Sequence, residues 1–193
     1  MTYELHWKCI PMGAIVPYEN WYDPFLGQGV YMPVVATNDG KYVGYYVGES
    51  DDIGRRWRET LQKWFLNPDE EDWIAISAEE FLADPVNVFN EERMGQGLDN
   101  RIEIQKQILD KTWFCFAEVN DLRPWHSREN IEYVLQLGLK MHVGIEQDGY
   151  IGDNGRGRPR GKLTVVNHMG RPFFADTLPA IISFDDGDRV EVS

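Results

Sequence analysis

Apolar residues fall into short continuous or alternating runs that predict a sheet. The runs at 29–36 and 41–48 are rich in Val and Tyr and flank Asn38-Asp39-Gly40, a turn signal that predicts a β-hairpin. The continuous run 113–119 predicts a buried strand. We also expect an initial strand and an aromatic-rich loop within 1–28, loop and strand over 141–146 and 163–166, and short strands over 180–184 and 189–192.

Helical spacing follows the hairpin. Ile53, Trp57 and Leu61 recur at i, i+4 and i+8 after the polar patch 49–52, which predicts a helix over residues 51–65. Asn67-Pro68 ends that helix, because a residue before proline is pushed out of the helical region. One or two helical turns are expected at 78–82, and a longer helix at 98–110.

The clearest helical start lies after the third apolar run. Ser127 is a good N-cap, although Asn130 stands where a full capping box has Glu or Gln. This helix is expected to end near Gly138. The residues expected to face the core from it are Ile131, Val134, Leu135 and Leu139.

Length and charge shape the expected domain. A chain of 193 residues, 42% of them hydrophobic, suits a single domain over 1–193. Within it, 67–112 form an acidic insertion and 150–193 a C-terminal extension with a basic loop. The net charge of −13 argues against a protein that coats nucleic acid non-specifically. Basic residues are nevertheless concentrated in 55–58 and 155–162, so one basic face is compatible with an acidic whole.

The cysteines and the N-terminal residues indicate in which cellular compartment the protein is expected. Two cysteines make no disulfide framework, and Cys115, inside the buried run, is expected to be a buried thiol. The N-terminus lacks the pattern of a signal peptide, and no apolar run reaches the length of a membrane span. A cytoplasmic setting is therefore the expectation.

A three-part pattern occupies residues 29–58. Gly29-Val30-Tyr31 opens the hairpin, Tyr46-Val47-Gly48 closes it, and Arg56 follows ten residues after Tyr46. This pattern resembles the GIY-YIG nuclease family, and the resemblance implies an α/β (α+β) fold with a small, mainly antiparallel sheet flanked by helices. The chain departs from the family in a longer linker between the triplets and in Thr60, where some members have a histidine.

The resemblance also assigns a metal to a glutamate on the helix after the third strand. Glu132 stands at the edge of the buried face of that helix and is the expected ligand of a divalent cation, Mg²⁺ or Mn²⁺. Glu129 and then Glu103 are the alternatives. The expected catalytic residues are therefore Tyr31, Tyr46, Arg56 and Glu132.

The sequence leaves open whether other polar residues belong to the site. The late asparagine of the family corresponds to Asn154 or Asn167, and His168 is the most site-like of the four histidines. The histidines show no ligand spacing, and no zinc or Ser/His/Asp pattern is present. Strand tyrosines, solvated helix arginines and surface glutamates in ion pairs are the ordinary structural alternatives.

The second informative stretch is Arg156-Gly157-Arg158-Pro159, which resembles the core of an AT-hook. Glycine and proline would keep such a flexible arm thin, so that its arginines can enter a narrow A·T minor groove. A plain mobile loop is the alternative. The residues expected to bind DNA are Arg55, Arg58, Arg156, Arg158, Arg160 and Lys162.

Together the resemblance implies a metal-dependent DNA endonuclease of the restriction, repair or mobile-element type. The size of the chain and the hook-like loop favour a sequence- or structure-selective enzyme of the restriction type. One alternative is a catalytically inactive GIY-YIG-like module that binds DNA or a protein. A second is an acidic mimic or inhibitor of nucleic-acid binding, for which the charge of −13 is the argument. DNA is the expected partner, no membrane is expected, and monomer and homodimer both stay open.

Overall fold

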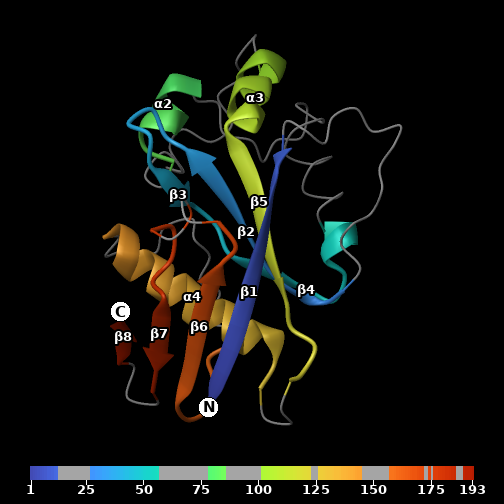
Figure 1. Cartoon of the computed structure of the whole chain (residues 1–193), viewed down its shortest axis with the longest axis vertical. Coiled ribbons are helices and arrows are strands. Elements are labelled where there is room, and N and C mark those ends of the chain that lie inside the picture. The colour runs from blue at the N-terminus through green and yellow to red at the C-terminus, as the bar shows by residue number, and fades with distance from the viewer. Residues whose placement is uncertain are drawn as a thin grey trace.

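In the part of the chain that the structure describes, eight strands form one curled sheet in the order β3-β2-β5-β1-β6-β7-β8, with β4 beside β2 (Figure 1). This structure is a computed structural model that describes residues 1–12, 27–56, 78–85, 101–122, 126–144, 157–171, 174, 176–185 and 189–193, without the side chains of 101–105. The strands are β1 (Thr2–Pro11), β2 (Gly29–Ala36), β3 (Tyr42–Gly44), β4 (Gly48–Ser50), β5 (Thr112–Glu118), β6 (Leu163–Met169), β7 (Ile181–Phe184) and β8 (Val190–Val192). The helices with described bounds are α2 (Ala78–Ala83), α3 (Arg101–Asp110) and α4 (Arg128–Val143).

Strand β1 joins the two halves of the sheet. Its residues 8–11 pair antiparallel with β5, and its residues 2–7 pair parallel with β6. The other described strand pairs are antiparallel. The α+β class is thus confirmed, whereas the sheet is larger than the small one expected and contains a parallel pair.

The hairpin over 29–48 is confirmed, but its second half is divided into two strands. β3 pairs with the end of β2, with Gly44 opposite Val34, while β4 pairs with its start, with Gly48 opposite Tyr31. Three residues, 45–47, therefore lie opposite two residues, 32–33, of β2. The extra residue between β3 and β4 makes this a β-bulge. Pro33 accepts a hydrogen bond from the Tyr45 N–H (3.4 Å) and has no N–H to return. Tyr46 lies in this bulge rather than on a strand, contrary to expectation.

Helix α4 covers one face of the sheet (Figure 1), and the four residues predicted to face the core are completely buried in it. The Asn130 side chain accepts a hydrogen bond from the Ser127 N–H (2.7 Å), so asparagine supplies the contact that Glu or Gln makes in a capping box. The helix ends at Gly144, where φ is 76°. The predicted end at Gly138 was wrong, and 141–143 are helical rather than loop or strand.

Gly138 instead lets α4 approach the sheet closely. A Cβ at this position would lie 2.7 Å from Cγ1 of Ile182 on β7 and would overlap its Cδ1. Glycine in a helix interior costs about 1 kcal/mol relative to alanine. Close packing against β7 offsets that cost here and explains a glycine where the sequence indicated a helix end.

Cys9 and Cys115 lie directly opposite each other on β1 and β5 and form a disulfide. The expectation of a buried thiol at Cys115 was therefore wrong. The two residues are far apart in sequence, so only the pairing of β1 with β5 brings them together. The cytoplasmic setting loses the support that it drew from unpaired cysteines and stays a prediction.

The acidic insertion 67–112 is described in two parts, α2 and α3, which pack on each other at one end of the molecule (Figure 1). The Asn38 N–H in the hairpin turn donates to the Leu82 carbonyl oxygen (2.9 Å) and so ties α2 to the turn. Both helices match the predicted positions. Among the described residues, no helix is long and apolar enough to cross a membrane.

Candidate functional site

The two glycine–tyrosine triplets owe their glycines to close packing. Gly29 begins β2, and a Cβ there would overlap the Ala117 carbonyl oxygen on β5. Gly48 begins β4 opposite Tyr31, and a Cβ there would lie 2.5 Å from the Tyr31 hydroxyl oxygen. The hydroxyl end of the Tyr31 ring therefore packs directly on Gly48, and a larger residue would displace it.

Tyr31 and Tyr46 form a pair at the centre of the site. Their ring centroids lie 6.0 Å apart, and their hydroxyl groups are hydrogen-bonded. Tyr31 is only 3% exposed and stacks on Phe114 at 5.5 Å, whereas Tyr46 is half-buried. Burial raises the pKa of both hydroxyl groups, so both stay protonated at neutral pH. Tyr31 thus orients Tyr46, and Tyr46 is the member of the pair that a ligand can reach.

Arg56 contributes a positive charge beside the tyrosine pair. Residues 53–56 form the first described turn after β4, and Asp52 caps it by accepting from the Arg55 N–H (2.8 Å). The exposed Arg56 is close enough to lower the pKa of Tyr31, of Tyr46 and of Glu132. The neighbouring Arg55 forms an ion pair with Asp51 (3.1 Å).

Glu132 approaches this group from α4. Burial, with the charges of Glu49 and Glu129 next, raises its pKa to about 7, and Arg56 counteracts part of that shift. Gln136 donates one hydrogen bond to the Glu132 carboxylate (3.2 Å) and another to the Val47 carbonyl oxygen (3.1 Å). Gln136 therefore holds α4 and its glutamate against the second triplet.

The structure brings the four residues expected to be catalytic, Tyr31, Tyr46, Arg56 and Glu132, into one electrostatically coupled group. The alternatives are less favourably placed. Glu129 is exposed one turn earlier on α4, and the Glu103 side chain lies outside the described residues.

Sequence reasoning missed a second carboxylate. Glu49 on β4 forms an ion pair with Arg128 (3.1 Å), whose other donor reaches the Gln28 side chain (2.5 Å). Glu49 lies next to Gly48, so its adjacency to the triplet was the available signal. In the sequence, Glu49 belongs to the polar patch 49–52, which predicts a helix start. The division of the second apolar run into β3 and β4, which places Glu49 on a strand, is not visible in the sequence.

The chemistry of these oxygens fits a hard divalent cation. After burial, the charge of Glu49 is the next cause of the raised pKa of Glu132, so the two carboxylates repel each other. A cation between carboxylates relieves such repulsion, and oxygen ligands are the ones that Mg²⁺ prefers. Because Glu49 is already paired with Arg128, Glu132 is the residue with more to gain from a metal.

The remaining predicted residues divide into three groups. Asn167 is buried and structural, because it accepts from the Trp7 indole N–H (3.0 Å) and donates to the Pro179 carbonyl oxygen (2.9 Å). His168 is exposed and stacks on His6 (ring centroids 4.7 Å apart). The residues that lie outside the described part of the chain are Arg58, Thr60, Asn154 and Arg156.

The basic loop is described from Gly157 onward and is anchored there. Gly157, with φ 82°, accepts from the Asn130 side chain (2.6 Å) and lies so close to α4 that a Cβ would overlap the Glu129 backbone. The N-terminal amine donates to the Lys162 carbonyl oxygen (2.8 Å). Contrary to the expected flexible arm, 157–162 is held at both ends, with exposed side chains at Arg158, Arg160 and Lys162.

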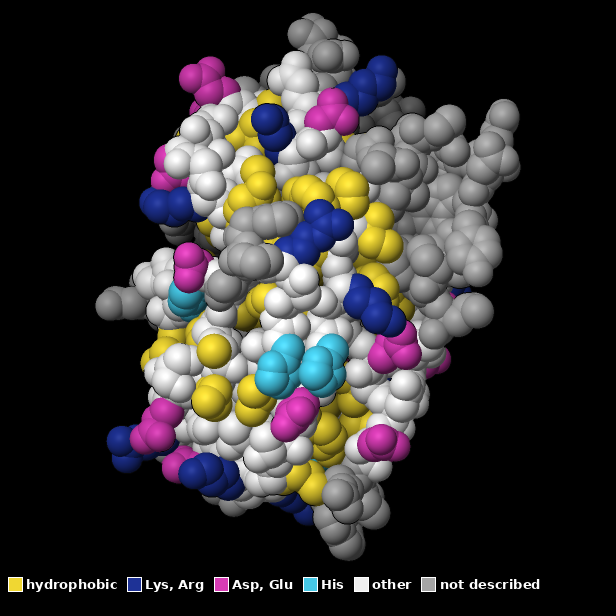
Figure 2. Space-filling view, in the orientation of Figure 1, with side chains coloured by type: hydrophobic (Ala, Val, Ile, Leu, Met, Phe, Trp, Pro, Cys, Tyr) yellow, Lys and Arg dark blue, Asp and Glu magenta, His cyan; other side chains and the backbone are white. Residues whose placement is uncertain are grey.

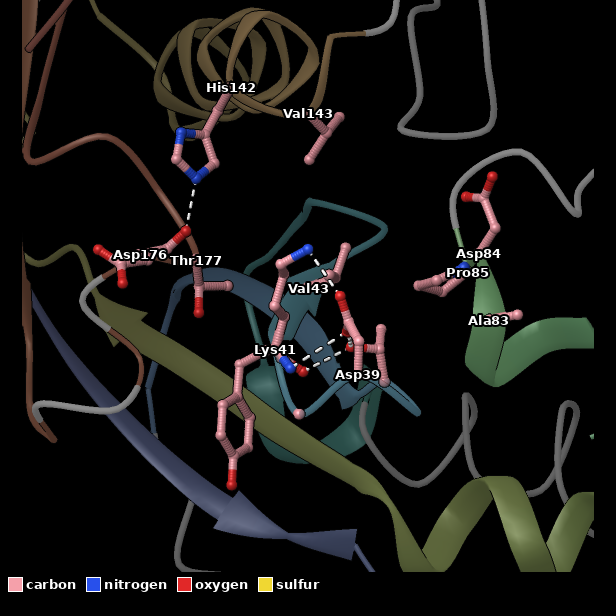
Figure 3. Close-up of a pocket in the computed structure, with 13 residues that line it drawn as sticks. Asp39, Lys41, Val43, Ala83, Asp84, Pro85, His142, Val143, Asp176 and Thr177 are labelled. Carbon is pink, nitrogen blue, oxygen red and sulfur yellow. Dashed lines mark hydrogen bonds and ion pairs between the residues drawn. The ribbon is translucent and has the colours of Figure 1, made fainter. Parts of the chain in front are cut away.

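A separate cavity of about 790 Å³ lies between the hairpin turn, the end of α2, the end of α4 and residues 176–177 (Figure 3). Lys41 is paired with Asp39 (2.6 Å) at its wall, and His142 contacts the Asp176 carbonyl oxygen (2.5 Å). No predicted site residue lines it among those that the structure describes. Its one lysine is paired with Asp39, and none of the residues predicted to be catalytic faces it among those described, so the tyrosine site is the better candidate.

Comparison with protein-family models, with curated proteins and with solved structures found no match for this chain.

Proposed function

We propose that this protein is a metal-dependent DNA endonuclease with a GIY-YIG-like site. The observation that carries the proposal is the convergence of Tyr31, Tyr46, Arg56 and Glu132 from the hairpin, the following helical turn and α4. Their chemistry matches the needs of phosphodiester hydrolysis, namely neutralised phosphoryl oxygens, an oriented water and a stabilised leaving oxygen.

Each residue has a distinct role in the proposed reaction. Arg56 donates hydrogen bonds to the phosphoryl oxygens, where negative charge grows in the transition state. The protonated Tyr46 is held by Tyr31. Its hydroxyl group donates a hydrogen bond that orients either the attacking water or the phosphate. Glu132 would hold Mg²⁺ or Mn²⁺, and that ion would supply neutralising positive charge and a more acidic water.

The anchored basic loop supports DNA as the substrate. The loop begins at Gly157, which packs on the first turn of α4, the helix that carries Glu132. Exposed cations at that position can hold the phosphate backbone beside the site, in an otherwise acidic molecule. The residues proposed to contact DNA are Arg55, Arg58, Arg156, Arg158, Arg160 and Lys162.

The test is cleavage of supercoiled plasmid with Mg²⁺ or Mn²⁺ and an EDTA control. Arg56→Ala is expected to slow cleavage on the order of 10²–10³-fold, the usual effect of losing one preorganised donor. Arg189→Ala is the matched control, because this exposed arginine lies next to β8 and pairs with Glu191 (2.9 Å). The Arg189→Ala protein should cleave plasmid at the wild-type rate. Both variants should unfold at the wild-type temperature.

Two results would redirect the proposal. Equal cleavage by folded Arg56→Ala and wild type would contradict the assigned role of this arginine. DNA binding without metal-dependent cleavage in the wild type would favour the inactive binding module.

Replacing Arg158, Arg160 and Lys162 together by Ala should weaken DNA binding at low salt and spare cleavage at saturating protein.

A further inference from the structure

Two histidines and a glutamate meet on the face of the sheet that α4 does not cover. The parallel register of β1 and β6 sets His6 directly opposite His168. Side chains alternate along a strand, so Glu4 projects to the same side as His6. All three are exposed, and Figure 2 shows a pair of neighbouring histidine side chains with an acidic side chain beside them.

The distances between these groups are short. The imidazole rings of His6 and His168 are stacked, with centroids 4.7 Å apart and planes 11° apart. The Nε2 atom of His168 lies 3.8 Å from a carboxylate oxygen of Glu4. One nitrogen or oxygen from each of the three residues lies within 4.8 Å of the others.

We infer that Glu4, His6 and His168 bind a divalent transition-metal ion of the zinc type. Two imidazoles and one carboxylate form the donor set that Zn²⁺ takes in open, three-residue sites. Imidazole nitrogen suits Zn²⁺, Co²⁺ and Ni²⁺, whereas Mg²⁺ prefers oxygen alone. This ion therefore differs in class from the cation proposed at Glu132, and the inference does not depend on the nuclease proposal.

The site needs a small contraction to close on a metal. Bonds of about 2.0–2.1 Å at tetrahedral angles set ligand atoms about 3.3 Å apart, nearer than they lie now. Exposed side chains can rotate by that amount without disturbing the core, while the backbone register of β1 and β6 keeps them on one side. The remaining coordination positions would face solvent.

The ordinary alternative is a surface ion pair beside a stacked ring pair, with no metal. Titration of the EDTA-treated full chain distinguishes the two possibilities. Binding of Zn²⁺ is measured by calorimetry, and binding of Co²⁺ is measured by its visible absorption. One ion that depends on the two histidines is expected, with the absorption of a four- or five-coordinate Co²⁺ centre, independently of any ion bound at Glu132. Loss of an outer-shell partner already costs about 10–100-fold in metal affinity, so His6→Ala or His168→Ala should cost at least as much.

Controls separate this site from adventitious binding. His142→Ala removes an exposed histidine outside the group, on α4, and should leave the affinity unchanged. Zn²⁺ should raise the unfolding temperature of wild type and of His142→Ala but not of the double variant His6→Ala/His168→Ala. Each variant is first shown to fold by circular dichroism. Absence of binding by wild type, unchanged affinity in the folded double variant, or displacement by excess Mg²⁺ would each overturn the inference.

Discussion

Glu132 illustrates at the level of one residue how the site works against the stability of the fold. Burial and the charges of Glu49 and Glu129 raise its pKa from 4.5 to about 7. The folded state therefore binds a proton more tightly than the unfolded state between these two values. Stability from this group is present below pH 4.5 and is lost as the pH rises through about 7.

We predict that Glu132→Gln makes the protein more stable than wild type above pH 7 and nearly equal to it below pH 4.5. A tenfold difference in proton affinity between the folded and unfolded states corresponds to about 1.4 kcal/mol of stability for a fully buried group. The rise of the Glu132 pKa from 4.5 to about 7 would correspond to about 3 kcal/mol on that basis. Because this carboxyl group is partly exposed, screening reduces the expected difference in stability to about 1–2 kcal/mol. Urea unfolding at several pH values measures the difference.

The matched control is Glu129→Gln, an exposed glutamate on the same helix. It should change stability less, because its own carboxylate faces solvent. Equal stability of Glu132→Gln and wild type at pH 8 would contradict the electrostatic account. Glu132→Gln should also lose metal-dependent cleavage. The expected result for this variant is therefore higher stability together with loss of activity.

At the level of elements, the position of α4 on the sheet decides where Glu132 lies. Gly138 permits the close contact with Ile182 on β7. Gly138→Ala should gain about 1 kcal/mol in helix propensity but lose about 1–3 kcal/mol through overlap with Ile182. We therefore predict net destabilisation, measured by urea unfolding.

A double-mutant cycle tests whether that contact is the cause. In the Ile182→Ala background the obstructing side chain is absent, so Gly138→Ala should become neutral or stabilising. The coupling energy between the two sites should be about 1–3 kcal/mol. Additive effects of the two substitutions would show that α4 is not held at this point.

At the level of the whole molecule, the Cys9–Cys115 disulfide closes a loop with a sequence separation of 106 residues. Such a link restricts the unfolded chain and typically stabilises a protein by about 2–4 kcal/mol. We predict that dithiothreitol lowers the urea midpoint of wild type, and that the variant Cys9→Ala/Cys115→Ala does not respond to the reductant. Two reactive thiols in the native, unreduced protein would contradict the disulfide.

The local patterns in the sequence determined much of the fold. The turn at Asn38-Asp39-Gly40, the buried strand after α3 and the buried face of α4 follow from residues within one element or one turn. The two triplets and Arg56 likewise lie within a short segment, so their proximity follows from a hairpin and a helical turn. Glu132 required the helix phase as well, which the spacing of Ile131 and Leu135 supplied.

Other features depended on which strands became neighbours, and only the tertiary structure decided them. The second run is divided where it passes Pro33, and the separate pairing of β4 with the start of β2 places Glu49 beside the site. The pairing of β1 with β5 joins Cys9 to Cys115, and its pairing with β6 joins His6 to His168. The periodicity of a strand fixes which face a side chain occupies, but it carries no information about the strand that will lie beside it.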